Sequence, residues 1–432
     1  MKPTVLLATT SSWFPTARLA VALAHAGFTV DAVCPPRHPL DKTSAVRQMC
    51  AYHGLTPLRS FADAVAATKP DFILPGDDLA TRHLHHLHGR ECAQERAGSE
   101  ICNLIERSLG APESFAIVYA RTAFMRLAQE EGIRVPQTET ISNTHDLRAW
   151  LAQMGFPTVL KADCTSGGEG VRVVHTIEEA EHAYRRLQAP PLLARAAKRA
   201  LVDQDKTLVW PSLLRRRPVV NGQAFVAGRE ATSTVACWNG VVLAGLHFEV
   251  LKKRSSAGPA TVMRLIENAE MTAAAEKIAR RLNLSGVHGL DFMLEADTGN
   301  AFLIEINPRS TQVGHLTLGP GRDLPAALYA AVSGQAVQPA AKLTEKDTIA
   351  LFPHEWLQDP ASSFLQSGYH DVPWQEPELV RACVRKRPKI GWYSRQNPIP
   401  SFSAVRLPVQ GRSAENSRDA GWIAKQSESP NA

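Results

Sequence analysis

Two carboxylates, an amide and a guanidinium lie close together in the sequence: Asp291, Glu305, Asn307 and Arg309. Carboxylate and amide oxygens are ligands that Mg²⁺ takes in proteins, and an incomplete cage lets the ion bridge to phosphates. Asn307 follows Glu305 by two residues, so the two side chains share one face of a strand. Arg309 offers a fixed positive charge for a phosphate or a developing oxyanion. These residue types predict metal-assisted phosphate chemistry, provided that they converge in space.

A β-hairpin would make them converge. Two apolar runs flank the loop Asp297–Gly299, and glycine suits the left-handed position that a three-residue hairpin loop needs. With that loop, Ala296 faces Asn300. Counting back along both strands then places Asp291 opposite Glu305, where a cation would relieve their repulsion. An exposed hairpin with coincidental charges is the alternative, but the intervening residues are too apolar for full exposure: Phe292, Leu294, Phe302, Leu303, Ile304 and Ile306.

A second group of residues combines a lysine with a glycine-rich loop. Lys161 ends an apolar strand-like run and precedes Ser166, Gly167, Gly168 and Gly170. Glycines let backbone N–H groups approach phosphates closely, and lysine adds a point charge. The loop is not a Walker A motif, because no Gly-Lys-Ser/Thr follows. Taken alone, the pattern fits a plain hairpin with a solvated lysine better.

The elements that must position these residues follow an α/β pattern. Strand-like runs at 5–9, 29–34 and 71–74 alternate with helical runs at 14–27 and 60–68, which predicts a parallel sheet near the N-terminus. A signal peptide is the alternative for residues 1–27, but polar residues interrupt the apolar run. The first turn, TTSSWFP, lacks GxGxxG, so a Rossmann dinucleotide site is excluded.

The central part alternates strands with amphipathic helices. We expect helices at 119–131, 147–154, 177–187 and 268–282, strands at 156–162, 171–175 and 219–227, and a hairpin at 232–245. Asn239-Gly240 is a strong two-residue hairpin turn. The segment 190–218 carries Pro and Arg residues and has no clear pattern. Residues from 411 onward are rich in Ser, Asn and Gly, which predicts disorder.

Composition sets the broad class of protein. The chain has 432 residues, of which 44% are hydrophobic and 21% charged, which is typical of two or three globular domains. No run of 18 apolar residues occurs, so we expect no membrane span. The net charge is +6, but residues from Arg381 onward carry +7 and the remainder −1. That basic end is either a solvated tail or a contact for nucleic acid or an acidic partner, and we favour the tail.

Cysteine and histidine patterns argue against metal or disulfide frameworks. The seven cysteines are odd in number and form no CxxC pair, so we expect neither a disulfide framework nor a structural zinc site, and a cytoplasmic location. His83, His85, His86 and His88 fall in one helical stretch. Only residues three or four apart share a helix face, so His85 and His88 could pair, but we expect no cysteine or third ligand at a spacing that completes a site. An exposed polar helix is the preferred interpretation.

Three further groups leave two interpretations open. Lys252-Lys253-Arg254 either faces phosphates or is a solvated charge run. His315 either touches substrate or is a buried, satisfied histidine, and we favour the latter. Asp77-Asp78 follows a strand of the N-terminal sheet, where open α/β sheets place ligands. A helix N-cap explains Asp78 equally well.

Taken in order, these motifs resemble the ATP-grasp superfamily over roughly Ala111 to Ala330. Lys161 and the loop after it match the second lysine and the flexible phosphate loop of that family. Arg121 stands where the family usually has its first ATP-binding lysine, and Gln223 stands where it has glutamate. Both replacements keep hydrogen-bonding ability, although arginine is bulkier and always charged. We expect altered nucleotide affinity rather than its loss.

The resemblance also implies ligand roles. Gln223 and the backbone of Val226, next to Phe225, would contact adenine, and Glu230 would bind ribose. Asp291, Glu305 and Asn307 match the metal ligands, for Mg²⁺ or Mn²⁺, and Arg309 matches the arginine that steadies an acyl phosphate. Arg309 and Lys161 would be the catalytic residues. The N-terminal region resembles the pre-ATP domain of biotin carboxylase and carbamoyl phosphate synthetase.

The resemblance implies the following architecture and activity. A pre-ATP α/β domain (1–112) would precede a two-lobed ATP-grasp domain (113–335, with an α+β lid at about 136–226), a C-terminal extension (336–410) and a disordered tail (411–432). The activity would be an ATP-dependent ligase that activates a carboxylate as an acyl phosphate for an amine or thiol nucleophile. A kinase-like phosphotransferase and a non-catalytic nucleotide-binding regulator are the alternatives. Partners would be small molecules and a second copy of the chain, rather than nucleic acid or membrane.

Overall fold

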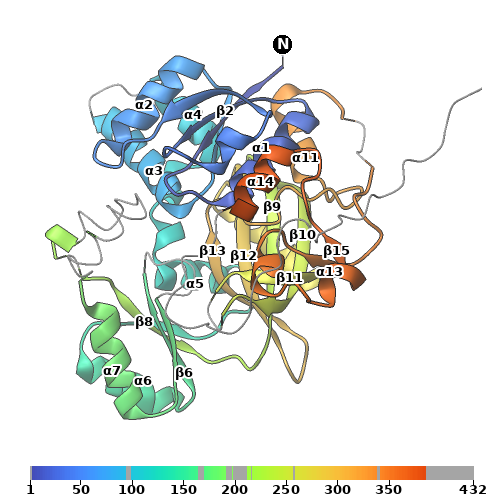
Figure 1. The fold of residues 1–432 in the computed structure, drawn as a ribbon. Helices are drawn as coiled ribbons and strands as arrows, with labels where there is room; N and C mark the ends of the chain where they lie inside the picture. Colours follow the sequence, from blue (N-terminus) through green and yellow to red (C-terminus); the bar gives the residue numbers. More distant parts are fainter. Residues whose placement is uncertain are drawn as a thin grey trace, which may run out of the picture. The chain divides into compact units, whose positions relative to one another are not determined.

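The strands of the chain are organised in separate sheets in the computed structural model (Figure 1). The structure describes residues 2–93, 99–163, 170–190, 197, 212–215, 217–255, 258–337 and 341–385. The loop residues Ser166, Gly167 and Gly168, most of the segment 190–218, and the tail from 411 lie outside this part of the chain. Within it, the mixed α/β class expected from the sequence is confirmed. In these residues no helix combines the length and the apolar character needed to cross a membrane.

The N-terminal sheet is parallel, as the strand–helix alternation predicts. Its order is β3-β2-β1-β4. Its strands are β1 (Thr4–Ala8), β2 (Thr29–Cys34), β3 (Val46–Ala51) and β4 (Phe72–Pro75), and its helices are α1 (Phe14–Ala26), α2 (Pro57–Thr68), α3 (Asp78–Ala93) and α4 (Glu100–Leu109). Helix α1 stops at Gly27, whose φ of 117° is open to glycine at little cost. The predicted strand and helix at this end of the chain are therefore present.

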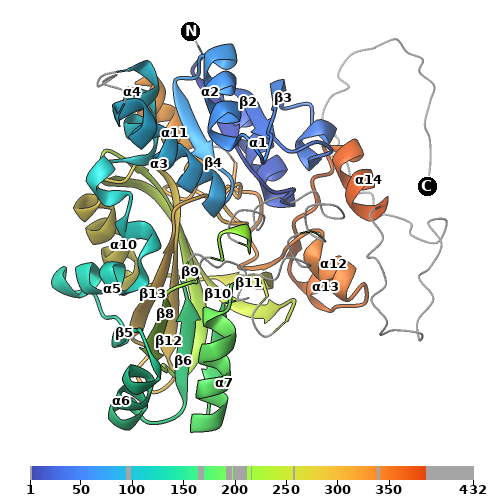
Figure 2. The ribbon, with the colours of Figure 1, turned by 90° about the vertical axis from the view of Figure 1, so that its left-hand side faces the viewer.

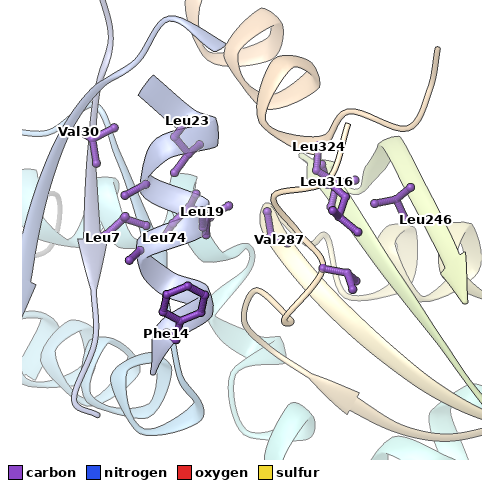
Figure 3. Packing of buried hydrophobic residues seen from close by; sticks show 14 of the residues in the cluster. Leu7, Phe14, Leu19, Leu23, Val30, Leu74, Leu246, Val287, Leu316 and Leu324 are labelled. Atoms are coloured by element: carbon purple, nitrogen blue, oxygen red, sulfur yellow. The ribbon is translucent and has the colours of Figure 1, made fainter. Parts of the chain in front are cut away.

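Both faces of this sheet are buried, which is usual for parallel sheets. Successive residues of a strand face opposite sides of the sheet and belong to two clusters. Leu7 and Leu74 pack with α1, while Leu6 and Ile73 pack with α2, α3 and α4. The α1 cluster continues beyond the sheet. Figure 3 shows Leu19 and Leu23 of α1 near Val287, Leu316 and Leu324, which belong to the largest sheet and the segment after it.

Helix α3 corrects one expectation. The four histidines were expected on an exposed polar helix, but His88 is buried and His85 stacks on Phe115 with ring centroids 3.7 Å apart. Burial lowers the pKa of His85 to about 3, so its imidazole stays neutral at physiological pH. The histidine spacing gave a wrong prediction because α4 and the turn after it cover this face of α3. Helical spacing alone does not show which face of a helix is covered.

A small antiparallel sheet carries Lys161. Its order is β5-β8-β6-β7, formed by β5 (Thr138–Ile141), β6 (Thr158–Ala162), β7 (Val171–Val174) and β8 (Val220–Ala224). Helices α6 (Thr144–Met154) and α7 (Ile177–Gln188) pack beside each other on it (Figure 1). Asn143 and Thr176 cap these helices through their side chains. A buried core with Trp150 and Leu160 holds the layers together.

The largest sheet carries Asp291, Glu305 and Asn307. Its order is β13-β12-β9-β10-β11-β14-β15. Its first five strands are β9 (Gly228–Trp238), β10 (Val241–Lys253), β11 (Ala260–Leu265), β12 (Gly286–Glu295) and β13 (Ala301–Asn307). Helices α5 (Arg121–Glu130) and α10 (Ala269–Arg281) cover one face, and α11 (Leu324–Ser333) contacts the other (Figure 2). The expected Asn239-Gly240 turn joins β9 to β10, with φ of 47° and 78°.

The described C-terminal residues extend this sheet instead of standing apart from it. Strand β14 (Thr348–Ala350) pairs with β11, and β15 (Tyr369–His370) pairs with β14. The remaining helices are α12 (His354–Gln358), α13 (Phe364–Ser367) and α14 (Pro377–Arg385). Asp371, just after β15, is buried and contacts Arg18 of α1 and the Nε2 atom of His315, 2.8 Å away. The open question about His315 is thereby answered in favour of a buried, hydrogen-bonded histidine.

Two glycine-to-alanine substitutions should change stability in opposite directions. A Cβ atom at Gly228 would lie 2.0 Å from the carbonyl oxygen of Leu294 on the paired strand β12, whereas one at Gly89 in α3 meets no atom within 4 Å. We expect Gly228→Ala to lower the free energy of unfolding by about 1–3 kcal/mol through overpacking. Gly89→Ala should raise it by about 0.5–1 kcal/mol by restricting the unfolded chain. Urea denaturation of both variants is the measurement, and equal effects would contradict the prediction.

Candidate active site

The hairpin β12–β13 places Asp291 opposite Glu305, as the sequence predicts. The predicted turn between the two strands is wrong, however. Ala296 does not face Asn300; its N–H bonds to Ala227, and the N–H of Glu295 donates to Asn300. The turn is therefore one residue longer than predicted. Gly299 still has the expected positive φ, at 73°.

A β-bulge compensates for the longer turn. Phe292 pairs with Leu303, but the next pair is Asp291 with Glu305, so Ile304 is the extra residue. Without it, Asp291 would face Ile304 and the two carboxylates would point to opposite sides of the sheet. The predicted pairing is right because two errors of one residue cancel.

The two carboxylates share a partly buried polar environment. Asp291 accepts hydrogen bonds from Thr232 Oγ1 at 2.8 Å and Asn307 Nδ2 at 2.9 Å. Burial and the charge of Glu305 raise the pKa of Asp291 to about 6. Burial alone would also raise the pKa of Glu305, but Arg121 and Lys161 outweigh it and lower that pKa. The arrangement concentrates negative charge that a cation would stabilise.

Two basic residues reach these carboxylates from different elements. Arg121, the first residue of α5, contacts Glu305, and its Nε atom lies 3.7 Å from Asp163. Lys161 of β6 is only 6% exposed. Burial lowers the pKa of Lys161 to about 8, although the nearby carboxylates, Glu305 first among them, favour its charged form. A strand of the small sheet thus supplies a cation to carboxylates of the large one.

A third cation, Arg309, is held by residues distant in sequence. Its Nε atom lies 3.2 Å from Asp78, its guanidinium stacks 5.1 Å from the ring of Trp13, and Asn307 accepts a hydrogen bond from it at 3.2 Å. The Asp78 carboxylate supports its positive charge, and the pKa of Arg309 is raised above its ordinary value despite burial. Because three segments hold the guanidinium, its orientation is restricted before any ligand binds.

Asp77 rather than Asp78 caps α3, which corrects the sequence interpretation. Asp77 Oδ1 accepts the N–H of Ala80 at 2.8 Å. Its carboxylate also accepts from the hydroxyl of Thr9 and from the N–H groups of Thr10 and Ser11, in the β1–α1 turn. Asp77 therefore shapes the turn that carries Trp13, while Asp78 is left to pair with Arg309.

Family models match this region in two adjoining parts. Residues 120–212 match the carbamoyl-phosphate synthase L chain ATP-binding domain, and residues 211–313 match the ATP-grasp domain. Together they include Arg121, Lys161, Asp291, Glu305 and Arg309, whereas Asp78 precedes them in the chain. Residues 120–313, which are 194 of the 432 residues, therefore match an ATP-grasp domain.

Relatives of known name cover parts of this chain. It is 26% identical over 199 residues to the carbamoyl phosphate synthase arginine-specific large chain of Geobacillus stearothermophilus, covering 44% of this chain and 16% of that one. It is 26% identical over 270 residues to the formate-dependent phosphoribosylglycinamide formyltransferase of Corynebacterium efficiens, covering 62% of this chain and 60% of that one. The chain thus spans less than two thirds of either relative.

Solved structures share the ATP-grasp fold over a longer stretch. The carboxyaminoimidazole ribonucleotide synthase of Aspergillus clavatus, complexed with ATP, is 16% identical with a TM-score of 0.55, covering 78% of each chain. The biotin carboxylase domain of the Hydrogenobacter thermophilus 2-oxoglutarate carboxylase, in complex with MgADP and bicarbonate, is 14% identical with a TM-score of 0.54, covering 79% of this chain and 72% of that one. At these identities the likeness concerns the fold.

The residues expected at the nucleotide base follow β8 of the ATP-grasp domain. Gln223 is buried, and its Nε2 atom donates to Thr138 Oγ1 at 3.0 Å. Phe225 is 42% exposed just beyond the strand, with Val226 half-buried beside it. Glu230 accepts a hydrogen bond from Lys253 Nζ at 2.5 Å. Of the residues expected in the phosphate loop, only Gly170 lies in the described part, where its carbonyl accepts from Ala162.

The two lysines at the end of β10 are paired with carboxylates. Lys252 Nζ donates to the fully buried Glu355 of α12 at 2.7 Å, and Lys253 contacts Glu230. Lys252 is therefore neither a phosphate contact nor a solvated charge. It joins α12 to the large sheet.

Three residues of the site escaped the sequence interpretation: Trp13, Asp163 and Thr232. Trp13 lies in the turn after β1, at the carboxyl edge of a parallel sheet, where α/β proteins bind ligands. That position was a usable indication. Asp163 follows β6 by one residue and accepts from Asn221 Nδ2 at 2.8 Å. Thr232 is opposite Asp291 on β9, which is visible only once the order of the strands is known.

Proposed function

We propose that this chain is an ATP-dependent ligase that activates a carboxylate as an acyl phosphate for attack by an amine or thiol nucleophile. One observation carries the proposal: two partly buried carboxylates, Asp291 and Glu305, lie among Arg121, Lys161 and Arg309. Phosphoryl transfer needs positioning and charge neutralisation more than covalent help from the protein, and this set supplies both. The match to an ATP-grasp domain supports the same chemistry.

The donor set fits a divalent metal ion. Asp291, Glu305 and Asn307 offer three oxygen ligands, which suits Mg²⁺ with Mn²⁺ as a substitute. Asn307 donates through Nδ2 to Asp291, so its Oδ1 atom faces the cationic side of the site and accepts from Arg309. Burial, and after it the charge of Glu305, raises the pKa of Asp291. When bound, the ion would neutralise negative charge on the phosphates.

The side chains of the protein would divide the remaining work. Lys161 and Arg121 would bind phosphate oxygens, together with Ser166, Gly167, Gly168 and Gly170. Gln223, Phe225 and the backbone of Val226 would receive adenine, and Glu230 would receive ribose in exchange for Lys253. Arg309, held by Asp78 and Trp13, would stabilise charge on the carboxylate as it attacks the terminal phosphate. Burial of Lys161 and Gln223 would strengthen the interactions of these two side chains.

The proposal is tested by trapping the intermediate. The protein is incubated with Mg-ATP and pools of carboxylic acids in the presence of hydroxylamine, which converts an acyl phosphate to a hydroxamate. We expect one pool to yield both ADP and hydroxamate. ADP without hydroxamate or free phosphate would indicate a phosphotransferase instead. Nucleotide binding with no ADP in any pool would indicate a regulator. Either result would overturn the ligase assignment.

Removing divalent metal should stop the reaction. With excess chelator, ADP formation should fall to background, because the repulsion of Asp291 and Glu305 from the triphosphate would no longer be offset. Added Mg²⁺ or Mn²⁺ should restore it. The measurement is ADP release against free metal concentration. Undiminished turnover in chelator would contradict the proposed ligand set.

A further inference from the structure

Four metal-binding side chains meet between α3 and α4, on the N-terminal sheet. His88 and Cys92 are four residues apart on α3, and Cys102 and Glu106 are four residues apart on α4. This spacing puts each pair on one helix face. Because the two helices pack against each other, the two faces meet. The cluster is separate from the hairpin site.

The distances within the cluster suit one shared ion. The sulfur atoms of Cys92 and Cys102 lie 3.4 Å apart, and His88 Nε2 lies 3.8 Å from Cys92 Sγ and 2.7 Å from Glu106 Oε1. The ligand atoms of His88, Cys92 and Cys102 all lie within 4.8 Å of one another, and Glu106 joins this group through its contact with His88. Around tetrahedral Zn²⁺, ordinary bond lengths separate two thiolates by about 3.8 Å and a nitrogen from an oxygen by about 3.3 Å. Zinc binding would therefore lengthen the Cys92–Cys102 and His88–Glu106 distances by only about half an ångström.

The surroundings favour a cation that binds from the solvent side. His88 and Cys102 are buried, whereas Cys92 is exposed and Glu106 is 43% exposed. The last turn of α3, which carries Cys92, has the negative end of the helix dipole. Two thiols, an imidazole and a carboxylate form a donor set of the softness that zinc prefers over magnesium.

We propose that His88, Cys92 and Cys102 bind one Zn²⁺ ion, which fastens α3 to α4, and that the Glu106 carboxylate turns from His88 to the ion as the fourth ligand. The Cys92 sulfur lies 3.9 Å from Nδ1 and 3.8 Å from Nε2 of His88. The imidazole ring would therefore rotate on binding, so that Nε2 points at the ion. With four protein ligands the site has no open position and is structural rather than catalytic. Helix α3 begins at Asp78, which contacts Arg309, so the ion would fix the far end of a helix that supports the hairpin site.

The test is the zinc content of the full chain, purified under reducing conditions and dialysed against metal-free buffer. Elemental analysis should find about one zinc ion per chain in the wild type, as expected for a closed structural site. Cys92→Ser and His88→Gln should each reduce it at least about tenfold, because a metal site with a missing ligand loses affinity steeply. Wild-type protein loaded with Co²⁺ should show thiolate-to-metal charge-transfer absorption, which both variants should lack.

Matched variants separate loss of the site from loss of the fold. Cys50→Ser and His86→Gln change the same residue types outside the cluster and should keep the full zinc content. Cys92 is exposed, so Cys92→Ser should fold, and circular dichroism checks this. Zinc equal in all variants, or no zinc in the wild type, would overturn the proposal. An intact mass two hydrogens lower, lost on reduction and absent from Cys92→Ser, would also overturn it, because it would identify a Cys92–Cys102 disulfide.

Discussion

Replacing Glu305 by glutamine should reduce ADP formation by about 10³-fold or more, the equivalent of the several kcal/mol that a metal-centred charge site contributes. The substitution keeps the shape of the side chain but removes the charge that faces Asp291. It also leaves Arg121 and the buried Lys161 without their principal carboxylate. The site would then hold excess positive charge and one fewer metal ligand. The measurement is ADP release with Mg-ATP and the pool that yields hydroxamate.

The matched control is Glu276→Gln, the same change at an exposed position of α10. It should leave turnover within about twofold of the wild type, as expected for a surface charge. A thermal melt of each variant separates lost chemistry from lost folding. If Glu305→Gln turned over normally while remaining folded, Glu305 would have no part in the reaction, and the proposed ligand set would be wrong.

Replacing Asp371 by asparagine should lower the free energy of unfolding by about 3–5 kcal/mol, the usual cost of breaking a buried ion pair from one side. Arg18 is 8% exposed and the Asp371 side chain 2%, so the arginine would remain buried without its counter-charge. His315 would lose the same partner. The three residues come from α1, the segment after β13, and the C-terminal residues. Chemical denaturation measures the effect.

Two further variants test this explanation. Asp359→Asn removes a carboxylate that is 46% exposed and 3.6 Å from Lys252, and it should cost less than about 1 kcal/mol. Adding Arg18→Met to Asp371→Asn should recover part of the loss, because no unpaired charge then remains buried. Equal losses in Asp371→Asn and Asp359→Asn would contradict the importance of burial.

The cluster of Arg18, Asp371 and His315 makes the free energy of unfolding depend on pH. Arg18 and His315 outweigh burial and lower the pKa of Asp371 below its ordinary 3.8, while burial lowers that of His315 below 6.5 despite Asp371. For both groups the unfolded chain binds protons first as pH falls. Their contribution to the free energy of unfolding is therefore complete above pH 6.5. It declines below that pH, as the histidine of the unfolded chain takes up a proton, and declines further below pH 3.8. Asp371→Asn should flatten the part of this decline below 3.8 in urea unfolding measured against pH.

The sequence by itself determined which residues have the capacity for chemistry. Asp291, Glu305, Asn307 and Arg309 were identified by type and spacing, and the alternation of apolar and polar residues placed them on one hairpin. Local signals also predicted the Asn239-Gly240 turn and the helix stop at Gly27. These features depend on neighbours in sequence, so periodicity and turn chemistry reveal them.

Only the tertiary structure decided how those residues are supported. The bulge at Ile304, the Trp13 and Asp78 contacts of Arg309, and the buried Arg18–Asp371–His315 cluster each join segments far apart along the chain. So does the meeting of His88 and Cys92 with Cys102 and Glu106, which helical spacing within α3 could not reveal. Periodicity states which residues share a face. Which face meets which partner depends on how sheets and helices pack, and that is decided by burial across the whole fold.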